Sequence, residues 1–234
     1  FDAKMNLSPL SLMEVQWWLD NIQSATKNIH HRQPDIVFHT DASRLGWGAR
    51  TSRHAHTAGI LSAAETTKHI NVLELLAIKL SLCSLLSLAH DTHIRVMWDN
   101  TTAVSYLNAM CGSKSKECNV LAKDIWEWAI MRNLWLSAAH IPGVSNVNAN
   151  ALSRDLNFDL EWLLSRSVFD TVVALFAQPD IDLFASRLNA QLENYASWKP
   201  DPMANYIDAF TVDWSAYFFM HFRLFVSYLG VFTR

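Results

Sequence analysis

The sequence predicts an α/β fold built on a mixed five-stranded β-sheet. Short apolar runs bounded by turn residues indicate the strands, and longer apolar segments indicate the helices between them. These elements follow the order β-β-β-α-β-α-α-β-α, and a right-handed crossover through the first long helix would place the fourth strand beside the first. Half of the 234 residues are hydrophobic and 18% are charged, so the chain can bury a substantial core.

Residues 1–34 precede the sheet and are predicted to form a connecting segment with one helix. Ser11 is the expected N-cap of that helix, with Glu14 at the capping-box position. The polar stretch after the helix ends at Pro34, which favours a linker. It contains His30-His31-Arg32, a cluster that could contact phosphate, although a solvated linker is the favoured interpretation.

The first three strands are expected to form a meander. They lie at 36–40, 46–51 and 57–61. Asp41 directly follows the apolar run of the first strand, and burying a carboxylate there is costly unless something positive meets it. Before the third strand, His54 and His56 stand two residues apart. Because no cysteine or carboxylate supports them nearby, the sequence disfavours a metal pair at these histidines.

Two further acids stand where the sequence permits burial. Residues 69–90 predict a long helix that is apolar on most faces, and Glu74 is its only acid. Its flanking leucines make a buried role about as well supported as a solvent-facing one. Strand 94–98 ends at Asp99-Asn100, and either residue can cap the helix predicted at 101–110. Alternatively, Asp99 belongs to a functional site and does not cap the helix.

The rest of the chain completes the sheet and then changes character. A helix, a strand that ends at His140, and a short helix are expected at 117–132, 134–139 and 146–154. Pro142-Gly143 separates the last two. Residues 156–234 are punctuated by proline and indicate a separate C-terminal extension. The sequence leaves open whether this extension folds on the preceding domain.

The predicted topology brings three carboxylates to one place. The first and fourth strands become neighbours, so Asp41 and Asp99 lie side by side, and the long helix carries Glu74 over them. Converging carboxylates repel one another unless cations neutralise them, which implies divalent metal. Oxygen ligands without cysteine select Mg²⁺ or Mn²⁺ over Zn²⁺. Two such ions about 4 Å apart are the usual device for in-line attack on a phosphodiester.

Four motifs in this region resemble a known family. They occur in the order and roughly the spacing of the ribonuclease H domain of retroelement reverse transcriptases, and are most similar to those of DIRS-type retrotransposons. The motifs are Thr40–Ser43 with Gly46–Gly48, Asn71–Ala77, Trp98–Thr101, and His140–Gly143 followed by Asn146 and Ala151–Arg154. The resemblance covers about residues 35–155. It implies a ribonuclease H-like fold with helices on both faces of the sheet.

The resemblance also implies a catalytic site. Asp41, Glu74 and Asp99 would be metal ligands, and His140 would be a mobile histidine near the scissile phosphate that assists water delivery or product departure. Where the family has a fourth acid, this chain has Asn150. An asparagine offers an oxygen ligand but no charge, so Asn150 would be a weak ligand. We therefore expect two ions, or one if this ligand fails, and reduced or absent cleavage.

Two interpretations of the function compete on this evidence. The first is a divalent-metal-dependent ribonuclease H, a hydrolase that cleaves the RNA strand of an RNA–DNA hybrid. The second is a catalytically impaired, ribonuclease H-like nucleic-acid-binding remnant of a transposon, which Asn150 favours. A transposase or integrase on the same fold fits less well, because those enzymes usually take their last acid from the final helix.

The implied substrate is an RNA–DNA hybrid, which such enzymes recognise through its A-like geometry and 2′-hydroxyl groups. Backbone contacts are expected from Ser43, Arg44, Asn71, Asn100, Thr101 and Ser105. The family's extra basic helix corresponds here to a stretch with only Lys114 and Lys116, for which a solvated loop is an equally good account. With a formal net charge of −3, the isolated chain should bind hybrid weakly.

The polymerase domain of a parent polyprotein is the expected partner. The flanking segments, 1–34 and 156–234, are also similar to DIRS-type sequence, so the chain resembles a fragment of such a polyprotein that lacks the polymerase. A linked polymerase would normally hold the substrate, which offsets the weak affinity of the nuclease domain.

The sequence also predicts a compartment. Three cysteines, no CxxC pair and no signal peptide favour a reduced intracellular protein, in the nucleus or cytoplasm. The apolar stretch 214–222 contains no formally charged residue and is too short to span a bilayer, so neither a transmembrane helix nor a membrane partner is expected. The sequence gives no indication of an oligomeric state.

Overall fold

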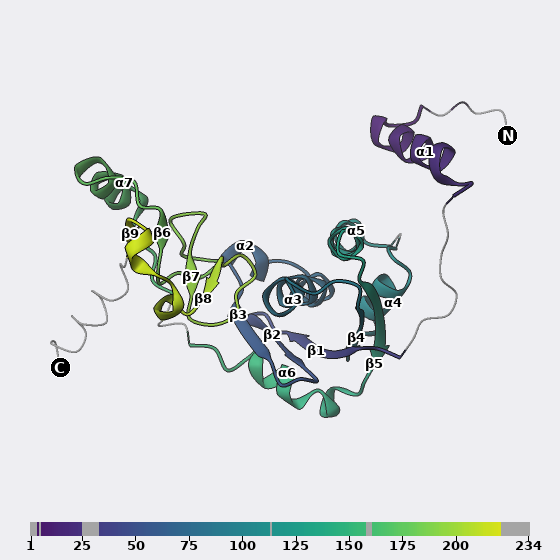
Figure 1. Ribbon diagram of the computed structural model, residues 1–234. Helices are drawn as coiled ribbons and strands as arrows, with labels where there is room; N and C mark the ends of the chain where they lie inside the picture. Colours follow the sequence, from purple (N-terminus) through teal and green to yellow (C-terminus); the bar gives the residue numbers. More distant parts are fainter. Residues whose placement is uncertain (1–3, 5, 25–32, 113, 158–160, 221–234) are drawn as a thin grey trace. The chain divides into compact units, whose positions relative to one another are not determined.

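The computed structural model describes residues 4, 6–24, 33–112, 114–157 and 161–220, and all structural statements concern these residues (Figure 1). The chain divides into two units, Phe1–Gln33 and Pro34–Arg234, which are treated separately. The predicted linker cluster His30-His31-Arg32 and the tail from residue 221 onward lie outside the described residues. Within the described part, no helix is both long and apolar enough to cross a membrane.

The first unit contains helix α1 (Pro9–Asn21), which begins earlier than predicted. The N-cap is Ser8, whose side chain accepts a hydrogen bond from the Ser11 backbone N–H at 3.1 Å. The prediction of Ser11 as the cap was wrong because Pro9 occupies the first helical position. There its fixed φ suits a helix and its missing N–H costs nothing.

The second unit is organised around a five-stranded sheet with the order β3-β2-β1-β4-β5. Its strands are β1 (Ile36–Ala42), β2 (Gly46–Thr51), β3 (His56–Ile60), β4 (His93–Trp98) and β5 (Trp135–His140). The first three pair antiparallel, whereas β4 pairs parallel with both β1 and β5. This confirms the predicted mixed sheet and the crossover that places the fourth strand beside the first.

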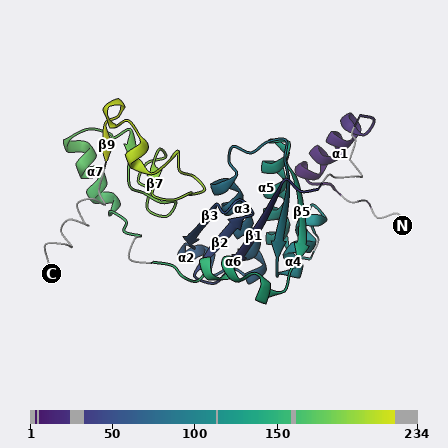
Figure 2. The same ribbon diagram turned by 60° about the horizontal axis from the view of Figure 1, so that its bottom comes forward.

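Helices cover both faces of the sheet, as expected. The helices are α2 (Ala63–Thr66), α3 (Ile70–Leu85), α4 (Thr101–Asn108), α5 (Lys116–Ile130) and α6 (Val147–Leu152), with a 3-10 turn η1 (Gly143–Ser145) before the last. Helices α3, α4 and α5 lie on one face, and α6 lies on the other, against β1 and β2 (Figures 1 and 2). The α/β fold that the resemblance implied is therefore the fold observed.

The long helix α3 is shorter than predicted. It ends at Leu85, because the chain must turn back before it can enter β4. Asp91 makes that turn with a φ of 53°, a left-handed conformation that aspartate tolerates better than most residues. Asn133 donates a hydrogen bond of 2.7 Å to the Asp91 carboxylate and so holds the turn. The apolar pattern of the sequence continues to residue 90 and therefore does not indicate that the helix ends at Leu85.

The main core fills the space between the sheet and helices α3, α4 and α5. Phe38 of β1, Leu75 of α3 and Trp98 of β4 are fully buried within it. Ile125 of α5 and Leu107 of α4 are equally buried and complete the layer. This packing fixes α3 over the ends of β1 and β4, which is where the predicted acids lie.

The described part of the C-terminal extension has short elements and its own small core. The elements are α7 (Arg166–Leu175), β6 (Ile181–Asp182), β7 (Ala196–Ser197), β8 (Tyr206–Ile207), η3 (Ala209–Thr211), η4 (Trp214–Ala216) and β9 (Phe219–Met220). Ile181, Leu183 and Ala196 form the centre of that core. The extension also contacts the sheet, since Arg187 donates a hydrogen bond of 3.1 Å to the Ile60 carbonyl.

Candidate metal centre

Three carboxylates from three different elements meet at one edge of the sheet. Asp41 lies in β1, Glu74 lies in α3, and Asp99 directly follows β4. One oxygen from each lies within 4.8 Å of the others. Asp41 and Glu74 are 3% and 5% exposed, and Asp99 is half-buried. The predicted convergence is therefore present, and it follows from the parallel pairing of β1 with β4 and from the packing of α3 over both.

Asp41 lies within β1 rather than after it, because the strand runs two residues beyond its predicted end. It pairs with Gly48 of β2. A Cβ at Gly48 would lie 2.4 Å from the Leu152 Cβ, so only glycine lets α6 approach β2 this closely. That approach brings in Ser153, whose hydroxyl donates a hydrogen bond to Oδ2 of Asp41.

Glu74 is held by two donors on a single carboxylate oxygen. Its Oε2 accepts from the Ala42 backbone N–H at 3.1 Å and from the Trp98 indole Nε1–H at 2.8 Å. Both donors come from the strands that carry the other two acids. The sequence left a buried and an exposed role for Glu74 equally open, and the structure shows the buried one.

Burial and mutual repulsion disfavour the simultaneous ionisation of the three carboxylates. Burial raises the pKa of Glu74 to about 8, opposed by the hydrogen bond from Trp98 and reinforced by the charges of Asp41 and Asp99. Burial also raises the pKa of Asp41, while the hydrogen bond from Ser153 opposes the rise. The cluster therefore holds its full negative charge at neutral pH only if a cation compensates it.

The donor set fits a hard divalent cation. All three side chains offer carboxylate oxygens, and neither histidine nor cysteine belongs to this group, which suits Mg²⁺ or Mn²⁺. Asn150 donates from Nδ2 to the Gly143 carbonyl at 3.0 Å. Its Oδ1 is buried and has no hydrogen-bond partner among the described atoms. This oxygen is an unused acceptor of the kind that a weak fourth ligand would provide.

His140 lies at the same edge of the sheet but outside the acidic group. It is the last residue of β5, is exposed, and pairs across the ladder with Trp98. The turn that follows it approaches Asp99 closely, because a Cβ on Gly143 would lie 2.9 Å from Asp99 Oδ2. The catalytic role of His140 stays a prediction.

The predicted substrate contacts surround the acids in two groups. Asn100 caps α4 through Ala103 and donates a hydrogen bond of 3.0 Å to Asn71, so the cap is Asn100 and Asp99 is left for the acidic group. Thr101 and Ser105 are exposed on α4.

The second group lies in the turn between β1 and β2. Arg44 is exposed there, and the Ser43 hydroxyl donates to the Ser153 carbonyl at 2.8 Å. The same hydroxyl accepts from the backbone N–H groups of Leu45 and Gly46, so Ser43 already has a structural role in this turn. Contact of any of these residues with nucleic acid stays a prediction.

Two residues that orient the acids had no assigned role in the prediction. Ser153 and Trp98 belong to the four motifs but not to the predicted ligands, and they donate hydrogen bonds to Asp41 and Glu74 respectively. A signal for Ser153 was present, since it stands three residues after Asn150, one helical turn away. For Trp98 the signal was its place directly before Asp99, but nothing local tells a core indole from one whose N–H is aimed at an acid.

Comparison with known proteins gives structural likenesses only. A scan against protein-family models and a search of curated proteins give no match. LC11-RNase H1, isolated from compost by a metagenomic approach, shares 20% identity over 51% of this chain and 93% of its own, with a TM-score of 0.42. It has also been solved in complex with an RNA/DNA hybrid.

Two further similar structures come from named organisms. RNase H1 of the halophilic archaeon Halobacterium salinarum NRC-1 shares 18% identity over 51% of this chain and 97% of its own, with a TM-score of 0.42. The N-terminal RNase H domain of a Mycobacterium tuberculosis protein shares 17% identity over 53% and 93%, with a TM-score of 0.44. Likenesses at these identities and TM-scores carry no argument about function, which therefore rests on this chain's own residues.

Proposed function

We propose that this chain is a divalent-metal-dependent ribonuclease H of retroelement origin, which hydrolyses the RNA strand of an RNA–DNA hybrid. The observation that carries the proposal is the group of three carboxylates, with one oxygen of each within 4.8 Å of the others. It lies in the fold that the resemblance to the ribonuclease H domain of reverse transcriptases implied. The motifs that carry this resemblance also supply all three acids.

The side chains divide the work of the proposed site. Asp41, Glu74 and Asp99 would hold divalent metal, which supplies Lewis acidity toward a phosphodiester. Ser153 and Trp98 fix the rotamers of two of these acids, so the ligands do not have to reorganise when they bind.

Residues around the acids would contact the nucleic acid and assist the movement of water or product. The paired amides of Asn71 and Asn100 lie beside the acidic group and suit contact with the hybrid backbone. The exposed His140, at the same edge of the sheet, would assist water delivery or product departure. The polymerase domain of a parent polyprotein would hold most of the hybrid, because this chain carries a net charge of −3.

A second candidate function rests on one observation. At position 150 the chain has an asparagine, which brings no negative charge to the site, and its Oδ1 is buried without a hydrogen-bond partner in the described part of the chain. A site that lacks this charge would hold its metal more weakly. The chain would then be a ribonuclease H-like module that binds hybrid but cleaves it poorly or not at all.

A cleavage assay separates the two functions. The wild type, Asn150→Asp and the control Asp41→Asn are incubated with a labelled RNA–DNA hybrid in Mg²⁺ and in Mn²⁺, and binding is measured in parallel in Ca²⁺. Cleavage by the wild type that Asp41→Asn abolishes supports the ribonuclease. Cleavage by Asn150→Asp alone identifies a disabled nuclease. If neither the wild type nor Asn150→Asp cleaves the hybrid while both of these proteins bind it, the enzymatic proposal is wrong.

A further inference from the structure

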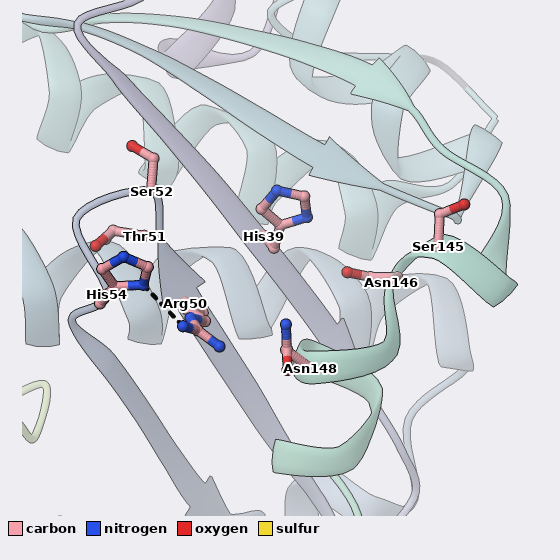
Figure 3. A pocket seen from close by; sticks show the side chains of 8 residues that line it. All are labelled: His39, Arg50, Thr51, Ser52, His54, Ser145, Asn146 and Asn148. Carbon is pink, nitrogen blue, oxygen red and sulfur yellow. Dashed lines mark hydrogen bonds between the residues drawn. The ribbon is translucent and has the colours of Figure 1, made fainter.

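A polar cavity lies on the face of the sheet that carries α6 and is separate from the acidic group (Figure 3). Its volume is about 280 Å³. Three segments line it: β1 contributes His39, the end of β2 and the following turn contribute Arg50 and His54, and the η1–α6 segment contributes Asn146 and Asn148. None of these side chains has a role in the proposed metal site.

The cavity is rich in hydrogen-bond donors and favours an anion. Arg50 carries a permanent positive charge, and its Nη2 lies 2.8 Å from Nδ1 of His54. A guanidinium can only donate, so His54 Nδ1 accepts and the ring proton is on Nε2, which is a second donor. The described residues that line the cavity include no aspartate or glutamate. Arg50 is therefore the single formally charged residue among these lining residues, in a chain whose net charge is −3.

The cavity also contains one buried acceptor. Asn146 is 1% exposed, and its Nδ2 donates to the Thr40 carbonyl at 2.9 Å. Its Oδ1 points into the space between His39 and Asn148 (Figure 3), where it lies near His39 without a well-aligned hydrogen bond. A ligand that satisfies both kinds of group has an anionic part for Arg50 and a hydroxyl that donates to Asn146.

The cavity and the acidic group are close enough for one strand of nucleic acid to reach both. His39 stands two residues before Asp41 in β1, so the two side chains point to the same face of the sheet, roughly 7 Å apart along the strand. The cavity volume suits a single phosphate with part of its sugar, since pockets for whole small molecules begin at roughly 300 Å³.

We propose that this cavity binds a backbone phosphate of the RNA strand, with the neighbouring ribose 2′-hydroxyl donating to Asn146 Oδ1. The proposal rests on the proposed function for the identity of the strand. The cavity would place the RNA relative to the acidic group and would favour ribose over deoxyribose at one position. Arg50 supplies the charge, and His54 and Asn148 supply further donors to the phosphate oxygens.

A binding experiment without cleavage tests the proposal. Affinity for an RNA–DNA hybrid is measured in Ca²⁺ across a series of salt concentrations for the wild type, Arg50→Gln and Arg53→Gln. Arg53 is the matched control, because it is exposed in the same turn but does not line the cavity. We expect Arg50→Gln to weaken binding about 3- to 10-fold and to reduce the salt slope by about 0.7–0.9, the value for one lost phosphate contact.

The outcomes distinguish this proposal from the proposed function. The cavity proposal is overturned, and the nuclease stands, if the wild type cleaves the hybrid and both Arg50→Gln and Arg53→Gln bind it as tightly as the wild type does. If no variant cleaves but Arg50→Gln alone binds weakly, the cavity proposal stands and the nuclease fails. Thermal unfolding of Arg50→Gln checks that the variant is folded.

A second measurement does not depend on hybrid binding. Inorganic phosphate, a ribonucleoside 3′-monophosphate and its 2′-deoxy analogue are titrated while the NMR signals of His54 are followed. Signals that shift with all three, with the ribonucleotide binding most tightly, support the assignment. Shifts with inorganic phosphate alone, or no shifts at all, overturn it.

Discussion

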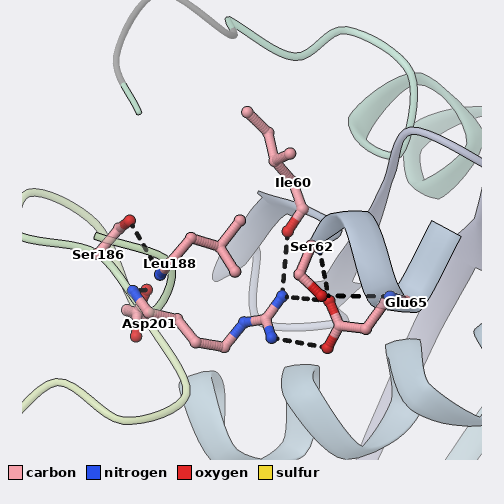
Figure 4. Close-up of polar contacts among 7 residues, drawn as sticks. Ile60, Ser62, Glu65, Ser186, Leu188 and Asp201 are labelled. Carbon is pink, nitrogen blue, oxygen red and sulfur yellow. Dashed lines mark hydrogen bonds and ion pairs between the residues drawn. The ribbon is translucent and has the colours of Figure 1, made fainter. Parts of the chain in front are cut away.

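Arg187 and Glu65 form a bidentate ion pair that joins the C-terminal extension to the sheet domain. Figure 4 shows Glu65 at this contact with its neighbours Ile60 and Ser62. Nη1 of Arg187 lies 2.8 Å from one carboxylate oxygen, and Nη2 lies 3.0 Å from the other. The two side chains are only 14% and 16% exposed. Burial alone would raise the pKa of Glu65, but the hydrogen bonds from Arg187 and Ser62 hold that pKa below its ordinary value. The extension is therefore anchored at this point of the domain.

Arg187→Ala should destabilise the protein by about 3 kcal/mol, because it leaves Glu65 buried without its cation. The control is Arg166→Ala, which removes an ion pair with Asp170 whose side chains are 70% and 57% exposed, and should cost at most about 1 kcal/mol. Chemical denaturation measures both free energies of unfolding. Equal small losses in the two variants would show that the buried pair does not anchor the extension.

The stability of the metal-free protein should fall as the pH rises. The pKa of Glu74 is about 8 in the folded protein and near 4.5 when unfolded, so folding favours the protonated carboxyl. The resulting contribution to stability is complete below pH 4.5 and is lost between about pH 4.5 and 8. In EDTA we expect the melting temperature to fall across this range, by about 2–4 °C for each kcal/mol lost.

Glu74→Gln is the matched variant for this pH dependence, since it keeps the shape of the side chain and cannot ionise. Its melting temperature in EDTA should change much less between pH 5 and pH 8. Mg²⁺ should raise the melting temperature of the wild type at pH 8 and raise that of Glu74→Gln less, because a cation compensates the ionised cluster. Parallel pH profiles for the two proteins would contradict this assignment.

Ser153→Ala should weaken metal binding without removing a metal ligand. The Ser153 hydroxyl donates to Asp41 and stabilises its charged form, and the loss of such an orienting partner typically costs about 10-fold or more in metal affinity. Calorimetric titration with Mn²⁺ measures the change. The control is Ser105→Ala, on the exposed side of α4, which should bind Mn²⁺ as the wild type does. Unchanged affinity in Ser153→Ala would refute the positioning role.

The acidic site was predictable where it depends on the order of elements, and not where it depends on tertiary contacts. Asp41 and Asp99 each come after an apolar run in the sequence, and the handedness of the crossover brings the two strands together, so their convergence could be derived. The bond from Ser153 to Asp41 spans 112 residues and depends on how closely α6 packs on β2, which no local pattern encodes. The same holds for the cavity at Arg50, because the η1–α6 segment that forms one of its walls is distant in sequence from β1 and β2.

Gly48→Ala tests whether that close packing of α6 shapes the acidic site. An added Cβ would lie 2.4 Å from the Leu152 Cβ and 2.7 Å from the backbone nitrogen of Ser153, so α6 must move and carry Ser153 away from Asp41. We expect a loss of about 1–3 kcal/mol in stability together with weaker Mn²⁺ binding. Gly112→Ala is the control, because its Cβ would meet the Tyr106 ring at 2.5 Å, remote from the acids. Both variants should melt at lower temperature, but only Gly48→Ala should lose metal affinity. An equal effect on Mn²⁺ binding in both would show that stability alone, and not the approach of α6, controls the site.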